Sequence, residues 1–287
     1  MTAAPLLAHT REELAVLLAG RRSGCPVGLV PTMGALHAGH ASLMERARKE
    51  VGSDAPVVVS IFVNPMQFAP GEDLDRYPRA FDADLAVCAD QGVDVVFAPS
   101  VEEVYPGGEP QVTVEPGPLG NVLEGSSRPT HFRGVLTVVA KLFGLVRPDV
   151  AVFGEKDYQQ LVLIRRMVSD LCMGVDVVGA DIVREDNGLA LSSRNRYLDE
   201  DHRWRAAALS RTLFAARGAA KHGADAAFAA ARHELRHARG VDLGYLELTD
   251  PDLGPAPDAG PARMLIAARV GTTRLIDNVA LTLHRTS

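Results

Sequence analysis

The chain has 287 residues, of which 47% are hydrophobic, and its formal net charge at pH 7 is −6, so it suits one large or two modest globular domains. The acidic balance argues against a dedicated nucleic-acid-binding protein, and no apolar run is long enough to predict a membrane span. Residues 1–9 lack the features of an export signal, and Cys25, Cys88 and Cys172 have neither zinc-site nor disulfide-framework spacing, so we expect a cytoplasmic protein.

The first residues of the chain predict alternating helices and strands. Thr10 and Glu13 have the spacing of a capping box for a helix that runs to about Leu18. Residues 26–30 predict a short apolar strand, and apolar side chains recur at helical spacing in residues 43–51.

Residues 31–40 (Pro-Thr-Met-Gly-Ala-Leu-His-Ala-Gly-His) join this strand to this helix. Because the first N–H groups of a helix lack partners within the helix and the macrodipole there is positive, the turn predicts a site for phosphate or carboxylate. Gly34 and Gly39 allow a ligand close to the backbone, and His37 and His40 can donate hydrogen bonds to phosphate oxygens. A surface or capping role is the structural alternative for either histidine.

Gly34 and Gly39 also have the spacing of the two glycines of a P-loop. His40 stands where that motif needs lysine, which excludes a P-loop.

Residues 55–64 are apolar on both faces, as expected of a central parallel strand. Asn64 and Gln67 therefore lie just past the carboxyl end of a strand, the edge at which ligands bind in open α/β sheets. A polar loop with Tyr77-Pro78-Arg79 leads to a helix at 81–91 and a strand at 93–98.

Residues 100–133 are rich in Pro and Gly and predict a long connection. Its basic side chains Arg128, His131 and Arg133 favour a functional loop over a disordered one. An apolar helix is expected at 134–146, followed by a short strand.

Gly154-Glu155-Lys156-Asp157 follow the strand at 149–153 and precede a helix at 158–171, which repeats the arrangement of the first turn. Lys156 could neutralise phosphate charge, and Asp157 could cap the helix or hold a cation through water. A solvated Lys–Asp pair is the structural alternative.

Residues 175–184 predict a further strand, and Gly188 a tight turn. Ser192, Ser193 and Arg194 then form a compact donor cluster suited to a triphosphate or to leaving pyrophosphate. Short polar loops of this kind are abundant, so this cluster alone is weak evidence.

The composition changes in the last third of the chain. Residues 199–240 predict two alanine-rich helical segments broken near Gly223, and strands are expected at 242–249, 264–270 and 273–278. We predict an α/β protein with a Rossmann-like parallel-sheet N-terminal domain, residues 1–185, and a smaller α+β C-terminal lid domain, residues 186–287.

Taken together, these motifs resemble the pantothenate synthetase family, the ATP-dependent pantoate–β-alanine ligases of the class I synthetase-like nucleotidyltransferase superfamily. H-x-G-H alone indicates only a nucleotide-binding relative of class I synthetases, whereas the order and spacing of all the motifs are specific. The resemblance covers essentially the whole chain and rests on Pro31 to His40, Phe62 to Phe68, Tyr77 to Arg79, Gly154 to Leu161 and Leu191 to Asn195.

The resemblance implies a set of site residues. His37, His40, Lys156 and Arg194 would be catalytic, with His40 as the proton donor. Gln67 and Gln160 match the glutamines that hold pantoate, and Asp84 is expected to support the same region. The implied ATP-binding residues are Met33, Gly34, Ala35, Leu36, His37, Ala38, Gly39, His40, Gly154, Glu155, Lys156, Asp157, Val183, Leu191, Ser192, Ser193 and Arg194.

The resemblance also implies the reaction: (R)-pantoate and β-alanine condense through a pantoyl adenylate, and AMP and pyrophosphate are released. ATP would be a substrate, Mg²⁺ would bind mainly through its phosphates rather than in a protein metal site, and the protein would be a homodimer. Two alternatives stay open, namely a nucleotidyltransferase that releases a nucleotide conjugate and a non-catalytic nucleotide-binding regulator. Gln67 and Gln160 argue against the first.

Overall fold

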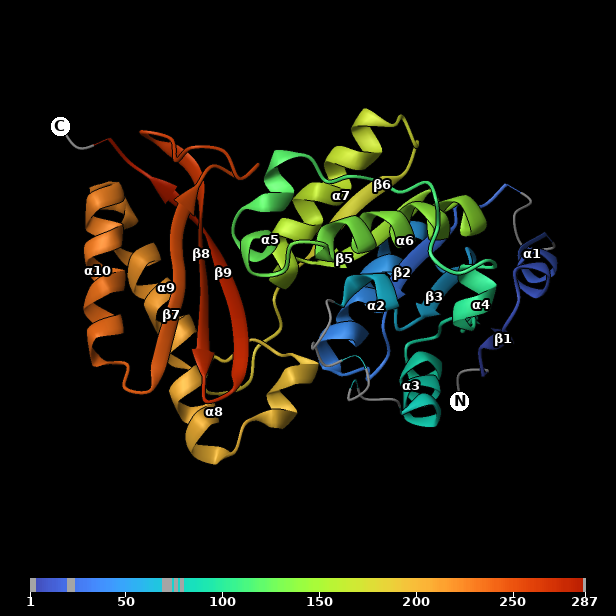
Figure 1. Ribbon diagram of the computed structural model, residues 1–287, viewed down its shortest axis with the longest axis horizontal. Coiled ribbons are helices and arrows are strands. Elements are labelled where there is room, and N and C mark those ends of the chain that lie inside the picture. Colours follow the sequence, from blue (N-terminus) through green and yellow to red (C-terminus); the bar gives the residue numbers. More distant parts are fainter. Residues whose placement is uncertain (1–3, 20–23, 69–73, 75–76, 78–79, 286–287) are drawn as a thin grey trace. The chain divides into compact units, whose positions relative to one another are not determined.

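The computed structural model describes residues 4–19, 24–68, 74, 77 and 80–285, so Pro78 and Arg79 of the Tyr77–Arg79 motif lie outside the described residues. The chain divides into a first compact unit, Met1–Glu155 with Gln159–Asp181, and a second unit, Lys156–Tyr158 with Ile182–Ser287 (Figure 1). We had expected the first domain to end at residue 185. In the structure residues 182–185 and the short segment 156–158 belong to the second unit instead.

The described part of the first unit contains a six-stranded sheet in which all neighbouring strands are parallel, in the order β1-β4-β3-β2-β5-β6. The predicted parallel sheet is thus confirmed. The strand order reverses between β2 and β5, so the carboxyl ends of these strands flank the position at which open α/β sheets bind ligands. The strands are β1 (Leu6–Ala8), β2 (Gly28–Thr32), β3 (Val57–Ile61), β4 (Val95–Phe97), β5 (Val150–Gly154) and β6 (Asp176–Ala180).

Helices cover the sheet because its central strands are apolar on both sides. Val57 and Val59 of β3 belong to one core cluster with Met44 and Ala47, whereas the equally buried Val58 points to the opposite face. The longer helices of this unit are α1 (Arg11–Ala19), α2 (Ala38–Val51), α3 (Phe81–Asp90), α6 (His131–Val146) and α7 (Tyr158–Asp170).

The connection expected at 100–133 contains short helical pieces between extended segments. They are α4 (Val101–Val104), η3 (Pro118–Asn121) and α5 (Glu124–Ser127), and two further 3₁₀ turns follow strand ends, η1 (Pro65–Gln67) and η4 (Glu155–Asp157). Helix α6 begins at His131, three residues earlier than predicted, so the basic end of that connection is the first turn of a helix.

The described residues of the second unit form an antiparallel sheet in the order β7-β8-β9, with α9 packed against β8 and β9 and α10 packed against α9. The fully buried alanines Ala216, Ala227 and Ala231 allow α9 and α10 to approach closely. The elements are η5 (Ser193–Tyr197), α8 (Glu200–Ala206), α9 (Ala208–Ala219), η6 (Ala220–His222), α10 (Ala224–His237), β7 (Val241–Thr249), β8 (Gly260–Val270) and β9 (Thr273–Leu283).

Three strand predictions were wrong in length. β8 and β9 are longer than expected because Gly260 pairs with Leu283 and the ladder continues without interruption to the turn. The strand expected at 175–184 ends at Ala180, and Arg184 instead makes an isolated bridge with Ala190. Among the described residues no helix is both long and apolar enough to cross a bilayer.

Candidate functional site

The turn between β2 and α2 holds two imidazole rings as hydrogen-bond acceptors. His37 is the N-cap of α2, and its Nδ1 accepts from the backbone N–H of Gly39 at 3.1 Å. His40 Nδ1 accepts from the N–H of His37 at 3.3 Å, and the two ring centroids are 4.2 Å apart. A ring nitrogen that accepts carries no proton, so each neutral ring has its proton on Nε2. The capping arrangement therefore makes both rings Nε2–H donors.

Asp84, a residue of α3, accepts hydrogen bonds from the backbone of the same turn. Its Oδ2 accepts from the N–H of Ala35 at 3.0 Å and its Oδ1 from the N–H of Leu36 at 2.7 Å, and the side chain is buried. Gly34 has a φ of +82°, and a Cβ there would lie 2.9 Å from Asp84 Oδ2, so the position requires glycine. Asp84 thus supports the turn, a supporting role of the kind that the family resemblance implied.

Four backbone N–H groups of this turn already have side-chain acceptors. Those of Ala35 and Leu36 donate to Asp84, and those of His37 and Gly39 donate to the imidazoles. The sequence had suggested that these N–H groups would attract an anion. In the structure these four groups bind side chains, and the histidines at the capping positions present Nε2–H groups as further donors.

The segment that carries Gln67 is fixed to the start of α6. Asn64 Nδ2 donates to the carbonyl of Gly134 at 3.0 Å, and the Tyr105 hydroxyl donates to Asn64 Oδ1 at 2.9 Å. Burial raises the pKa of Tyr105 to about 12, so this hydroxyl remains a donor at any physiological pH. Gln67 follows as the last residue of η1 and is buried.

The basic residues of the predicted functional loop also contact this segment. Arg128 Nη2 and His131 Nδ1 both approach the carbonyl oxygen of Gln67, at 3.1 and 3.0 Å, so the carbonyl accepts from both. Arg133 instead pairs with Glu115 at 3.1 Å. Arg128 and His131 therefore hold the backbone of a predicted substrate-binding residue, a role that the sequence did not reveal.

The adjacent glutamines of α7 have different environments. Gln159 is buried; its Nε2 donates to the carbonyls of Leu119 and Val122, each at 2.8 Å, and its Oε1 accepts from the N–H of Glu124 at 3.0 Å. Its amide therefore fixes the 119–124 segment. Gln160, by contrast, is only partly buried.

The Gly154–Asp157 motif is divided between the units. Glu155 belongs to the first unit, where its side chain lies beside Gly179, whereas Lys156 and Asp157 belong to the second. Lys156 Nζ lies 3.7 Å from Asp157 Oδ1, and the Asp157 side chain is half-exposed. An ion pair this long and this exposed is weak, so the Lys156 ammonium group can exchange Asp157 for a more highly charged anion.

A hairpin-like segment precedes the Ser-Ser-Arg cluster. The N–H of Leu191 donates to the carbonyl of Val183 at 2.9 Å, and Gly188 turns the chain with a φ of +90°. Ser192 Oγ then accepts from the N–H of Arg194 at 3.2 Å and caps η5. The cap fixes the local geometry of the cluster.

The structure thus places the predicted residues in two groups. His37, His40, Gln67 and Gln160 belong to the first unit, and Lys156, Val183 and Leu191–Arg194 belong to the second. No group of three or more His, Cys, Asp or Glu side chains suited to a metal ion occurs in the part of the chain that the structure describes.

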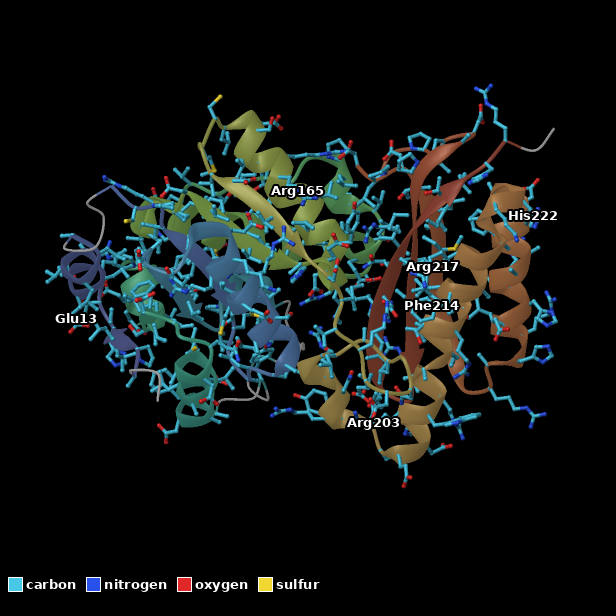
Figure 2. All side chains as sticks on the ribbon, turned by 180° about the vertical axis from the view of Figure 1, so that it is seen from behind. Glu13, Arg165, Arg203, Phe214, Arg217 and His222 are labelled. Carbon is cyan, nitrogen blue, oxygen red and sulfur yellow. The ribbon has the colours of Figure 1, made fainter. Side chains whose placement is uncertain are left out.

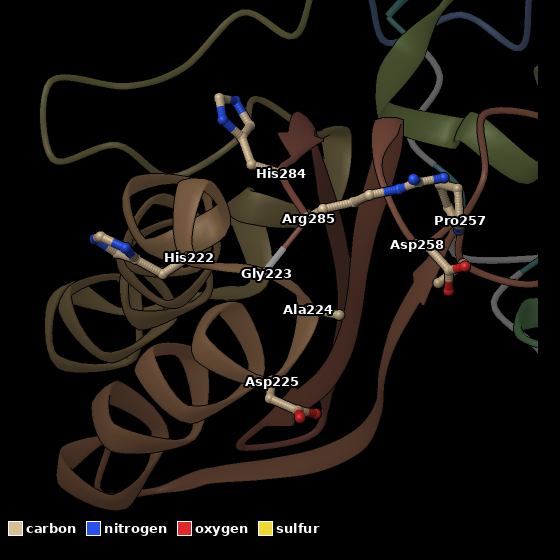
Figure 3. A pocket seen from close by; sticks show the side chains of 9 residues that line it. His222, Gly223, Ala224, Asp225, Pro257, Asp258, His284 and Arg285 are labelled. Atoms are coloured by element: carbon tan, nitrogen blue, oxygen red, sulfur yellow. The ribbon is translucent and has the colours of Figure 1, made fainter. Parts of the chain in front are cut away.

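The second unit also contains a hollow of about 450 Å³ (Figure 3). It is lined by His222, Asp225, Asp258, His284 and Arg285, among others, and by none of the predicted site residues. Acidic and basic side chains are mixed in its wall, so it shows no preference for a phosphate group.

Comparison with known proteins identifies the family. The pantoate-β-alanine ligase family matches residues 6–280, and a pantothenate synthetase of Nocardioides sp. is 68% identical, covering 99% of this chain and 87% of that protein. The crystal structure of pantothenate synthetase from Thermus thermophilus is 48% identical with a TM-score of 0.87, covering 96% of this chain and 98% of that one. Pantoate-β-alanine ligase from Francisella tularensis, crystallised with β-γ ATP and β-alanine, is 34% identical with a TM-score of 0.79, covering 96% and 97%. The chain therefore belongs to the pantoate–β-alanine ligase family.

Proposed function

We propose that this chain condenses (R)-pantoate with β-alanine to form pantothenate, a step toward coenzyme A, through a pantoyl adenylate. Membership in the ligase family supports the reaction, and the relative from Francisella tularensis was crystallised with β-γ ATP and β-alanine. The observation that carries the proposal is the pair of imidazoles with Nε2–H donors at the start of α2. Such donors suit the charge that develops on phosphate oxygens.

In the first half-reaction the pantoate carboxylate attacks the α-phosphorus of ATP. A carboxylate oxygen–phosphorus bond forms, the bond to the β-phosphate oxygen breaks, and pyrophosphate leaves with the electron pair. Phosphoryl transfer depends mainly on positioning and charge stabilisation. We assign stabilisation to His37, His40, Lys156, Arg194 and the hydroxyls of residues 192–193. His40, which the resemblance makes the proton donor, would act here by donating a hydrogen bond from its Nε2–H to a phosphate oxygen.

In the second half-reaction the neutral amine of β-alanine attacks the acyl carbon. A C–N bond forms, the C–O bond to AMP breaks with the electron pair leaving on AMP, and the proton lost by the amine passes to solvent water. Gln67 and Gln160 would bind the hydroxyl and carboxylate groups of pantoate without adding charge beside the triphosphate. The reaction needs no covalent enzyme intermediate, which agrees with a site built from donors rather than a nucleophile.

The ATP-binding set remains as the resemblance implies it: Met33–His40, Gly154–Asp157, Val183 and Leu191–Arg194. Mg²⁺ prefers oxygen ligands and keeps several of its waters. The half-exposed carboxylate of Asp157 fits a hydrated cation of this kind. The ATP phosphates would supply the direct ligands, and the cation would reduce the negative charge that pantoate meets.

We also propose that the enzyme is a cytoplasmic homodimer and that the C-terminal unit acts as a lid. Family resemblance supports the dimer. Sedimentation equilibrium is expected to give twice the chain mass, and a single-chain mass would contradict it.

The direct test mixes the protein with ATP, Mg²⁺, pantoate and β-alanine. We expect AMP and the amide to form only when both acids are present. A persistent nucleotide conjugate would indicate the nucleotidyltransferase alternative, and ATP binding without turnover would indicate the regulator.

Two variants test the residue roles. His40→Ala and Lys156→Ala should each slow AMP formation about a hundredfold or more, because each removes a donor to the phosphates. Circular dichroism should show that both variants fold. Turnover near the unmodified rate by both variants would refute the assigned roles.

A further inference from the structure

Two adjacent residues of β9 hold two of the segments that carry the proposed phosphate-binding side chains. Asp277 accepts from Arg184 in a bidentate pair, Nη1 to Oδ2 at 2.6 Å and Nη2 to Oδ1 at 2.9 Å. Arg184 Nη1 also donates to the carbonyl of Gly188 at 3.1 Å. Asp277 is buried, so this pair fixes the hairpin that leads to Ser192.

The next residue, Asn278, holds Lys156. Its Nδ2 donates to the Lys156 carbonyl at 3.1 Å, and its Oδ1 accepts from Arg263 Nη1 at 2.6 Å. Because arginine can only donate, Oδ1 must face Arg263, and Nδ2 must therefore face the Lys156 carbonyl. The orientation of the amide is thus fixed by chemistry.

The surroundings make this arrangement rigid. Asn278 and Arg263 are buried, and the Arg263 guanidinium lies 3.6 Å above the centroid of the buried Tyr158 ring. The Tyr158 hydroxyl donates to the carbonyl of Pro251 at 2.8 Å. The backbone from Lys156 to Tyr158 is therefore held at both ends by the second unit.

Asp277 and Asn278 point to opposite faces of the sheet, as neighbours on a strand must. Leu275 and Val279, which share the face of Asp277, belong to the helix-facing core, and the guanidinium of Arg184 on that side lies 5.0 Å from the centroid of the Phe214 ring. Figure 2 labels Phe214 on α9. One strand thus fixes the hairpin before Ser192 from one face and Lys156 from the other.

We propose that Asn278, oriented by Arg263, is a positioning residue that sets the backbone of Lys156 for the adenylation step. This inference rests on the proposed phosphate-binding role of Lys156. A lysine ammonium sits at the end of a flexible four-carbon stem. Fixing its backbone sets the point from which this stem extends, so that only the side-chain torsions have to be ordered when Nζ meets the phosphates. Asn278 acts through Lys156 and does not itself touch the substrate.

The test is a double-mutant cycle with Asn278→Asp and Lys156→Ala. Aspartate keeps the acceptor for Arg263 but places a second acceptor against the Lys156 carbonyl. The readout is pantoate-dependent pyrophosphate release without β-alanine, which reports adenylation alone. We expect Asn278→Asp to lower the rate about tenfold to a hundredfold, with an unchanged KM for pantoate and a melting temperature close to that of the unmodified protein.

If Asn278 acts through Lys156, adding Asn278→Asp to Lys156→Ala should cause no further loss. Independent, multiplicative losses would overturn the inference, because they would mean a general effect on the fold. An unchanged rate for Asn278→Asp alone would overturn it as well. An unchanged rate for Lys156→Ala would instead show that the proposed role of Lys156 is wrong, and the positioning role would fall with it.

Two further variants complete the design. Ala280→Ser lies two residues along β9, is exposed and should keep the full rate. Arg263→Lys retains a donor and a cation near Tyr158 but loses the planar guanidinium, so a partial loss of rate is expected. If Asn278→Asp does not fold, a double-mutant cycle that combines Arg263→Lys with Lys156→Ala tests the positioning role in its place.

Discussion

At the scale of single residues, His37 and His40 combine a structural and a chemical task. Their Nδ1 atoms accept the N–H groups of Gly39 and His37, which stabilises the start of α2. The same bonds fix the protons of the neutral rings on Nε2. The cap and the proposed phosphate donor are therefore opposite sides of the same ring.

This dual use can be separated by substitution at His37. Asparagine offers Oδ1 where the ring offers Nδ1, so His37→Asn should keep the cap, whereas His37→Ala should lower the free energy of unfolding by about 1 kcal/mol. Both variants lack the Nε2–H donor and should slow adenylation about a hundredfold. Urea denaturation and pyrophosphate release measure the two effects. Full activity of His37→Asn would show that Nε2–H is not used.

Burial also changes the acidity of one cysteine thiol, that of Cys88. It raises the pKa of Cys88 from 9.0 to about 12, with a smaller contribution from the charge of Asp84. Because the folded state holds this proton more tightly, the stability linked to Cys88 is present below pH 9 and is lost as pH rises toward 12.

The reactivity of the thiols provides the measurement. Treatment of the folded protein with iodoacetamide at about pH 8 should label the exposed Cys172 and spare Cys88, because the thiolate is the nucleophile. Labelling in urea should include Cys88. Mass spectrometry of the peptides distinguishes the sites, and equal labelling of Cys88 and Cys172 in the folded protein would contradict the pKa.

At the scale of elements, α6 and η1 meet at a glycine. A Cβ on Gly134 would lie 2.2 Å from the carbonyl oxygen of Met66 and 2.9 Å from the backbone nitrogen of Gln67. Because both are backbone atoms of η1, neither can make room for a side chain unless η1 itself is displaced. The sequence shows Gly134 only as a residue within a helical pattern, where it would be expected to weaken the helix.

Substitution of two glycines in this helix should have opposite effects. Gly134→Ala should destabilise the protein by about 1–3 kcal/mol through overpacking and raise the KM for pantoate by displacing Gln67. Gly144→Ala is the matched control, because a Cβ there would meet no described atom within 4 Å. It should stabilise the protein by about 0.5–1 kcal/mol and leave KM unchanged. A normal KM for Gly134→Ala would contradict the proposed role of Gln67.

Most elements were predictable because their patterns are local. Apolar spacing predicted α2 and the central strand β3, and the periodicity of residues 134–146 predicted most of α6. β1 was missed because Leu6–Ala8 is too short to show a pattern and is ordered by pairing with β4. The ends of β8 and β9 were missed for a similar reason, since antiparallel pairing extends them.

At the scale of the whole molecule, the proposed site residues are shared by the two units. The chain passes between them after Glu155, after Tyr158 and after Asp181. If ATP binds as proposed, both units should therefore respond to the nucleotide.

Hydrogen exchange can test this expectation. A non-hydrolysable ATP analogue with Mg²⁺ should slow exchange in peptides that cover Met33–His40 in the first unit and Leu191–Arg194 in the second. Peptides from α10 (Ala224–His237), which contains no proposed site residue, are the control and should not change. Protection confined to one unit would contradict the proposed ATP-binding set. Lys156→Ala should weaken protection in both regions.

By itself the sequence determined the parallel α/β class, the order of most elements and the set of motifs that marks the family, because each depends on residues close together in the chain. Only the tertiary structure decided what many polar groups do. Asp84 holds an N–H 48 positions away at Leu36, and Asn278 holds a carbonyl 122 positions away at Lys156. No periodicity or motif records such partners, since buried hydrogen bonds are matched in space by the packing of separate elements.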